Sequence, residues 1–159
     1  HCLQAWGRLL ELLGGHPRPQ CGFLLHSYGG PQEMVAAFVK LGAYFSLPGY
    51  FAHERKSRQR ETFQHIPPDR LLIETDAPDQ GLPERPSEAG EKKERGLAYS
   101  QYEWTDAATG KRLNHPANLA AVYQFAATLR AEPLEALASQ IEQNFHRLFG
   151  RVAGKPAGH

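Results

Sequence analysis

Three short apolar segments, each preceded by a helix-like segment, constrain the fold of this chain more than any other feature. The apolar segments cover residues 22–26, 43–47 and 70–74. Their lengths are typical of buried strands, and glycine or proline residues stand close to their ends. The helix-like segments cover residues 3–13, 31–41 and 53–64. This alternation of helix and strand predicts an α/β fold with a parallel sheet covered by helices.

The helix predictions rest on the spacing of apolar residues and on proline and glycine. In residues 3–13, apolar side chains recur at helical intervals, and Gly14 and Gly15 follow as a C-terminal stop. The second helix is predicted to begin at Pro31, because the N–H that proline lacks has no partner in the first turn of a helix.

Residues 79–113 interrupt this alternation. They are polar, include a charged tract, and are predicted to form a long loop insertion. Two further helices are predicted at residues 117–131 and 134–149. We therefore expect one domain over residues 1–150, followed by a flexible tail at 151–159.

Composition narrows the function classes. The chain has 159 residues, of which 41% are hydrophobic, and a formal net charge of +1. This charge balance gives no general attraction to nucleic acid or to a membrane surface, so any polyanion binding must be local. No apolar stretch is long enough to span a membrane. The two cysteines, Cys2 and Cys21, favour a reducing cytoplasm with free thiols.

Polar residues that can bind a metal follow two of the predicted strands. His26 ends the first strand, and Asp76 follows the third, two residues after Glu74. His1 stands just ahead of the first helix, where a further strand would end. Strand exits meet at one face of a parallel α/β fold, so His1, His26 and Asp76 are predicted to share a metal site. Imidazole with carboxylate suits Zn, Mn, Fe or Mg.

Ordinary explanations exist for each residue taken singly. His26 can be a loop residue with an unremarkable hydrogen bond, and Asp76 can brace a turn. Glu74 can be a buried acid that supports a ligand. Their joint placement at strand exits favours the metal site.

Five motifs carry a resemblance to a known family. They are His1-Cys2, Leu25–Gly30 (LHSYGG), Leu72–Pro78 (LIETDAP), Asn114–Leu119 (NHPANL) and Asn144–Gly150 (NFHRLFG). In order and spacing they resemble the C-terminal half of TatD-family metal-dependent deoxyribonucleases.

The resemblance implies a TIM-type (β/α)8 barrel of the amidohydrolase kind, of which this chain covers roughly the C-terminal half. It also implies two divalent ions (Mg, Mn or Zn) and hydrolysis of phosphodiester bonds, typically in DNA and often as a 3′-to-5′ exonuclease. In that scheme His1 and His26 are metal ligands. Asp76 binds metal and helps to activate the water, and Glu74 supports it.

The chain also departs from the family pattern. The His-x-His pair of the family's first strand and the bridging glutamate of a later strand are absent, so we expect the N-terminal half of the barrel to be needed for a complete site. His115 stands where the family often has glutamate, and the 79–113 insertion is longer than usual.

Basic and aromatic residues are candidates for substrate contacts in this scheme. Arg55, Arg58 or Arg112 could neutralise phosphates, although solvated surface arginines are the more ordinary interpretation. Asn114 is a further candidate beside the site. The aromatic candidates for stacking on a nucleobase are Tyr28, Tyr50 and Phe51, and those for a flap over the site are Tyr99, Tyr102 and Trp104.

Two other functions stay open at this point. A related amidohydrolase could use the same metals on a small ester, amide or phosphoester, because fold does not fix substrate. A truncated, non-catalytic barrel fragment would instead expose open sheet edges.

Overall fold

The computed structural model describes residues 1–85 and 97–150 of the chain, and the predicted tail at 151–159 lies outside them. Its centre is a three-stranded parallel sheet in the order β1-β2-β3. The strands are β1 (Phe23–Leu25), β2 (Ala43–Pro48) and β3 (Leu71–Glu74). All three strands predicted from the sequence are therefore confirmed.

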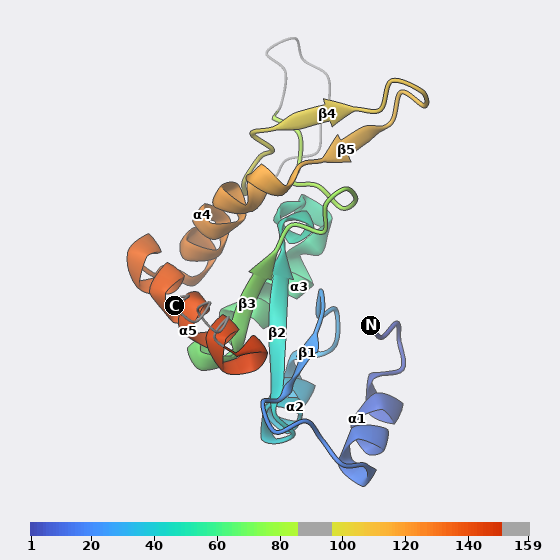
Figure 1. Cartoon of the computed structure of the whole chain (residues 1–159), viewed down its shortest axis with the longest axis vertical. Helices are drawn as coiled ribbons and strands as arrows, with labels where there is room; N and C mark the ends of the chain where they lie inside the picture. The colour runs from blue at the N-terminus through green and yellow to red at the C-terminus, as the bar shows by residue number, and fades with distance from the viewer. Residues whose placement is uncertain (86–96, 151–159) are drawn as a thin grey trace, which may run out of the picture.

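The register of the sheet brings the carboxyl ends of the strands together. Leu25 of β1 pairs with Phe45 of β2, and Pro48 at the end of β2 pairs with Glu74 at the end of β3. Because the pairing is parallel, the residues that follow β1 and β3 emerge at the same end of the sheet, on either side of β2 (Figure 1).

Helices pack around this sheet, as the alternating pattern predicts. They are α1 (Trp6–Gly15), α2 (Val35–Lys40), α3 (Ser57–Gln64), α4 (Leu119–Arg130) and α5 (Leu134–Phe149). Short 3-10 turns precede several of them, including Gln32–Met34 before α2 and Pro116–Asn118 before α4. Figure 1 shows α4 and α5 beside β3, and α1 beyond β1.

An aromatic cluster fills the space between the sheet and the first helices. The ring of Tyr28 lies edge-on to Trp6, Phe38 and Phe45, with centroids 4.6, 6.0 and 5.1 Å away. Tyr28, Phe38 and Phe45 are completely buried. Such edge-to-face packing adds to the free energy that burial alone provides.

Buried polar side chains anchor α5 to the start of β3. The side-chain amide of Asn144 donates hydrogen bonds to the carbonyl oxygens of Pro68 and Leu71, at 2.7 and 2.8 Å. A buried carbonyl without a partner is destabilising, so these bonds fix where α5 lies against the sheet.

Two predictions need correction. Helix α1 begins at Trp6 rather than at residue 3, so Leu3 of the predicted segment 3–13 lies outside the helix and is 92% exposed. The insertion at 79–113 is not only loop: in its described part, β4 (Glu103–Thr105) and β5 (Arg112–Asn114) pair as an antiparallel hairpin. The hairpin extends past the carboxyl ends of the parallel strands (Figure 1).

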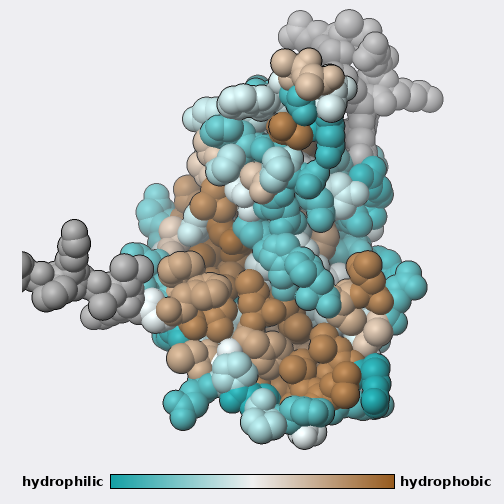
Figure 2. Space-filling model, turned by 45° about the vertical axis from the view of Figure 1, so that its right-hand side comes forward, coloured by the Kyte–Doolittle hydropathy of each residue, from teal (hydrophilic) through white to brown (hydrophobic). Residues whose placement is uncertain are grey.

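The apolar surface of α1 is only partly covered. None of its residues is fully buried, although Trp6, Leu9, Leu10 and Leu13 pack against the core. Figure 2 turns this side of the molecule toward the viewer and shows apolar side chains gathered over its lower part. Among the described helices, none is long and apolar enough to cross a membrane.

Candidate metal centre

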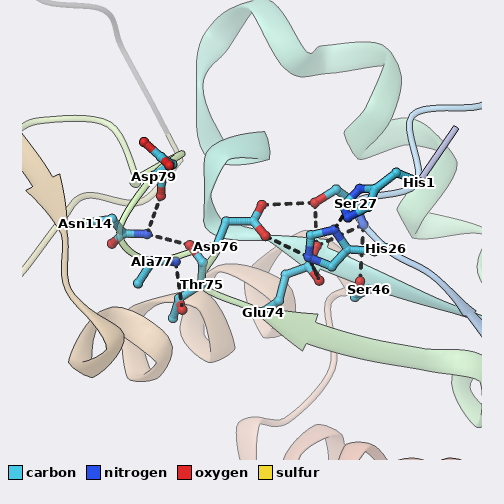
Figure 3. A network of polar contacts seen from close by, with 10 residues as sticks. All are labelled: His1, His26, Ser27, Ser46, Glu74, Thr75, Asp76, Ala77, Asp79 and Asn114. Carbon is cyan, nitrogen blue, oxygen red and sulfur yellow. Dashed lines mark hydrogen bonds and ion pairs between the residues drawn. The ribbon is translucent and has the colours of Figure 1, made fainter. Parts of the chain in front are cut away.

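His26, Glu74 and Asp76 converge at the carboxyl ends of β1 and β3. The Nε2 atom of His26 lies 2.8 Å from a carboxylate oxygen of Glu74 and 2.8 Å from one of Asp76. The potential ligand atoms of the three residues all lie within 4.8 Å of one another. They line an open hollow of about 530 Å³, and Figure 3 shows the imidazole pointing toward both acids.

Backbone conformation places these side chains. Ser27 and Asp76, which follow β1 and β3, adopt positive φ angles of 47° and 58°. Non-glycine residues rarely adopt this left-handed region, and aspartate is among those that do so more readily. The chain therefore turns sharply just after each strand, and Asp76 faces back toward His26.

Two serines, which the sequence reasoning missed, hold Glu74. The backbone N–H and the hydroxyl of Ser27 both donate to the same Glu74 oxygen, at 2.9 and 2.6 Å. The hydroxyl of Ser27 also lies 3.0 Å from Asp76, and its backbone N–H lies 3.2 Å from the hydroxyl of Ser46. The one available signal was Ser46, a polar residue inside the apolar strand β2.

Burial raises the pKa of the Glu74 carboxyl above its ordinary value. Hydrogen bonds from Ser27 and Ser46 act in the opposite direction, the nearby charge of Asp76 adds to the rise, and His26 opposes it. Two carboxylates therefore share a partly buried space with one imidazole.

The donor set fits a divalent cation. One imidazole nitrogen and two carboxylates are the ligands that Zn²⁺, Mn²⁺ and similar ions accept. A cation between the carboxylates would also reduce their mutual repulsion and offset the free-energy cost of burying the charge of Glu74. His26, Glu74 and Asp76 could thus hold a metal ion.

His1 lies beside this group. Its Nδ1 is 3.4 Å from Nδ1 of His26, and the two rings meet edge-on with centroids 4.5 Å apart. His26 therefore presents one ring nitrogen to the carboxylates and the other to His1. The structure brings the three predicted ligands together, but it places Glu74 rather than His1 among the converging donors.

Asn114 fixes the loop that carries Asp76. Its side-chain amide donates to the carbonyl oxygens of Thr75 and Asp79, and its backbone N–H donates to that of Pro78. Its own side-chain oxygen accepts from Asn118 at 3.1 Å. Asn114, predicted to lie beside the site, thus ties the end of the hairpin to the loop after β3 (Figure 3).

The prediction that Tyr28 contacts substrate is wrong. The ring is fully buried among aromatic side chains, and its hydroxyl donates to the carbonyl of Pro31 at 2.8 Å. The pattern failed because a tyrosine after a strand can point into the helix layer as easily as toward the strand exits. Phe51 is buried as well, whereas Tyr50 is only partly covered.

The predicted basic residues lie on the surrounding surface. Arg55 donates to the hydroxyl of Tyr50 at 2.6 Å and stacks over its ring, and Arg58 is exposed on α3. Arg112 pairs with Glu84 and Glu103. Contact of these arginines with phosphates stays a prediction.

The hairpin adds aromatic surface and a second hollow. Tyr102 and Trp104 are 51% and 60% exposed. Tyr50, Arg112 and Asn114 are among the residues that line a cavity of about 250 Å³ between the hairpin and the loop after β3. His115 accepts a hydrogen bond from the backbone N–H of Ala117 and so caps the turn before α4.

Comparison with known proteins gives a consistent result. The family model described as TatD related DNase matches residues 1–150. The 3′-5′ ssDNA/RNA exonuclease TatD of Escherichia fergusonii is 34% identical over 151 residues, covering 94% of this chain and 50% of that protein. The protein of the same name from Escherichia coli K12 is 31% identical over 154 residues, with the same coverage. The chain therefore spans about half the length of the curated relatives it matches.

Solved structures show the same fold. A TatD family hydrolase from Entamoeba histolytica superposes with a TM-score of 0.72 at 19% identity, covering 94% of this chain and 50% of that one. A TatD homologue from Escherichia coli k12 gives 0.65 at 23% identity, covering 91% and 46%.

Proposed function

Because this chain belongs to the family of TatD-related DNases, we propose that it supplies part of a divalent-metal-dependent phosphodiesterase, a 3′-to-5′ exonuclease acting on single-stranded DNA. The observation that carries the proposal is the convergence of His26, Glu74 and Asp76 at the carboxyl ends of parallel strands. In barrel enzymes, catalytic residues lie at this end of the strands.

The complete active site is proposed to lie in a (β/α)8 barrel, of which this chain forms roughly the C-terminal half. Two observations support this: relatives and solved neighbours are about twice as long as the region they share with the chain, and β1 and β3 are edge strands of the three-stranded sheet. Additional strands on these edges would cover their unpaired backbone groups. They would also bring further metal ligands.

The residues of this chain have separate roles in the proposed reaction. His26, Glu74, Asp76 and, at the edge of the group, His1 would hold two divalent ions, whose chemistry is to polarise a phosphate oxygen and to lower the pKa of bound water. Asp76 also accepts the proton of the attacking water. Ser27 and Asn114 keep the acids in position through the hydrogen bonds described above.

The substrate is proposed to lie along the hairpin. The exposed rings of Tyr102 and Trp104 can stack on bases, which every single strand offers. Arg112 can exchange its glutamate partners for phosphate. The two free thiols, Cys2 and Cys21, accord with a reducing compartment, and the cytoplasm is the proposed location.

A nuclease assay tests this function. It uses the protein in the form that its organism produces. Single-stranded DNA labelled at its 5′ end should give a ladder of shortened strands with Mn²⁺ or Mg²⁺, and DNA labelled at its 3′ end should release mononucleotide at once. Asp76→Asn should abolish both, whereas Glu135→Gln, at an exposed position in the first turn of α5, should not.

Other outcomes would redirect the proposal. Activity that survives Asp76→Asn would contradict it. Hydrolysis of small esters without any cleavage of DNA or RNA would instead favour an amidohydrolase with the same ligands.

A further inference from the structure

A further hollow lies at the opposite end of the parallel sheet from the candidate metal-binding group, which is formed by His26, Glu74 and Asp76. It has a volume of about 700 Å³ and is formed where the chain enters β1, β2 and β3. Four cationic side chains from four parts of the chain line it, namely Arg18, Lys40, Arg70 and Arg147. The strand starts and the strand exits are separated by the length of β2, about 20 Å for six residues.

The positive charge in this basic hollow is poorly compensated. No aspartate or glutamate is among the described residues that line it. The carboxylate of Asp69 lies 3.5 Å from Nε of Arg70 and is itself half-exposed. Within residues 1–85 and 97–150, Arg147 makes only long contacts, 3.4 and 3.5 Å, to Asn144 and Gln143.

The structure fixes the position of Arg70 beside the hollow. Its guanidinium lies over the ring of Tyr44, with 5.0 Å between its central carbon and the ring centroid, so its position is fixed. Its Nε is nevertheless buried with no hydrogen-bond partner among the described residues. Asp69 therefore gives Arg70 a loose ion pair without a hydrogen bond at Nε, and the charge of the guanidinium remains available to attract an anion in the hollow.

We propose that this hollow binds an anion with several phosphate charges. Guanidinium groups match phosphate oxygens with paired, charge-assisted hydrogen bonds, and three of the four cations are arginines. A cluster of four cations favours a pyrophosphate-like group over a single carboxylate. The source of the phosphates is either a free oligophosphate or the backbone of a nucleic acid strand, and the site is separate from the metal-binding group.

Cys21 provides a local readout, because this exposed thiol lines the same hollow. In a Cys2→Ser background it is the only cysteine of the chain. We expect pyrophosphate, added in EDTA at constant ionic strength, to slow alkylation of Cys21. EDTA keeps the metal-binding group from capturing the anion.

Substitutions decide whether the cations are responsible. Arg18→Ala and Lys40→Ala should each weaken pyrophosphate protection of Cys21 about tenfold. Arg8→Ala removes the same charge from exposed α1, away from the hollow, and should leave protection unchanged. Asp76→Asn should also leave it unchanged, so failure here is distinguishable from failure of the proposed nuclease.

Three outcomes would overturn the proposal: no protection at millimolar pyrophosphate, protection that survives both Arg18→Ala and Lys40→Ala, or equal loss in Arg8→Ala. A single-stranded oligonucleotide in place of pyrophosphate identifies the source. Protection by the oligonucleotide at lower concentration assigns the site to a nucleic acid strand, and the reverse order assigns it to a free oligophosphate.

Discussion

Ser27 donates two hydrogen bonds to the same carboxylate oxygen of Glu74, from its backbone N–H at 2.9 Å and from its hydroxyl at 2.6 Å. These bonds join the exit of β1 to the end of β3 across the central strand β2. The two halves of the candidate metal centre, His26 on one side and the two acids on the other, are therefore held together without a cation. Such preorganisation favours tight and selective binding.

Replacing Ser27 with alanine should loosen the metal-binding group. Ser27→Ala removes the hydroxyl bonds to Glu74 and Asp76, so we expect Mn²⁺ affinity to fall about tenfold and the free energy of unfolding to fall by about 1–2 kcal/mol. Calorimetric titration and urea unfolding measure the two effects. The control is Ser57→Ala, at the exposed first residue of α3; equal losses in both variants would contradict a special role for Ser27.

Glu74→Gln should separate stability from metal binding. Burial raises the pKa of Glu74, so the folded metal-free protein disfavours its charge and loses stability as pH rises above 4.5. Glutamine carries no charge. In EDTA, the free energy of unfolding of the variant should therefore rise relative to that of the wild type between acid and neutral pH. Its Mn²⁺ affinity should nevertheless fall at least about tenfold. Urea unfolding at several pH values checks the first effect, and a pH-independent difference would contradict it.

Two asparagines with similar bonds should behave differently. Asn114→Ala and Asn144→Ala each leave two backbone carbonyls without a side-chain donor, so each should lower the free energy of unfolding by about 2 kcal/mol. Only Asn114 holds the loop that carries Asp76, so only Asn114→Ala should also weaken Mn²⁺ binding. Equal metal affinity in the two variants would show that the loop keeps its shape without Asn114.

Tyr28 should make the fold sensitive to alkali. Burial raises the pKa of its hydroxyl above 10.0, and Glu33 adds to the rise. Its contribution to stability is complete below pH 10 and is lost as pH rises further, because the unfolded chain ionises first.

Tyr28→Phe removes this pH dependence and the hydrogen bond to Pro31. The variant should be about 1 kcal/mol less stable than the wild type at pH 8, and this difference in the free energy of unfolding should shrink by pH 11. Urea unfolding at the two pH values measures the change. Burial also raises the pKa of Tyr123, but this residue is present in both proteins, so its effect cancels in the difference between them. An unchanged difference at pH 11 would contradict the burial argument.

The sequence predicted the elements of the sheet because their signals are local. Short apolar runs bounded by glycine and proline predicted β1, β2 and β3. Apolar spacing predicted α1 and α2, whereas α3 was predicted from a strongly charged segment. The hairpin β4–β5 was missed because each strand is only three residues long, with a single apolar residue, and neither strand has a buried residue. Its conformation depends on long-range bonds such as those of Asn114.

The candidate site was predicted in part for the same reason. His26 and Asp76 could be recognised at strand exits, but Ser27 and Ser46 acquire their roles only through contacts with residues distant in the sequence. Tyr28 shows the reverse error, since residue type and position did not reveal the direction of its ring. Glu74 was predicted to support the ligands, whereas its carboxylate lies 2.8 Å from Nε2 of His26 and belongs to the converging group of potential donors.

Anomalous scattering from a crystal of the protein soaked in Mn²⁺ tests the central claim most directly. We predict an Mn²⁺ peak bonded to Nε2 of His26 and to carboxylate oxygens of Glu74 and Asp76, at about 2.0–2.3 Å, which disappears in Asp76→Asn. A peak that lies elsewhere, or that persists unchanged in Asp76→Asn, would contradict the assignment of these three residues as a metal centre.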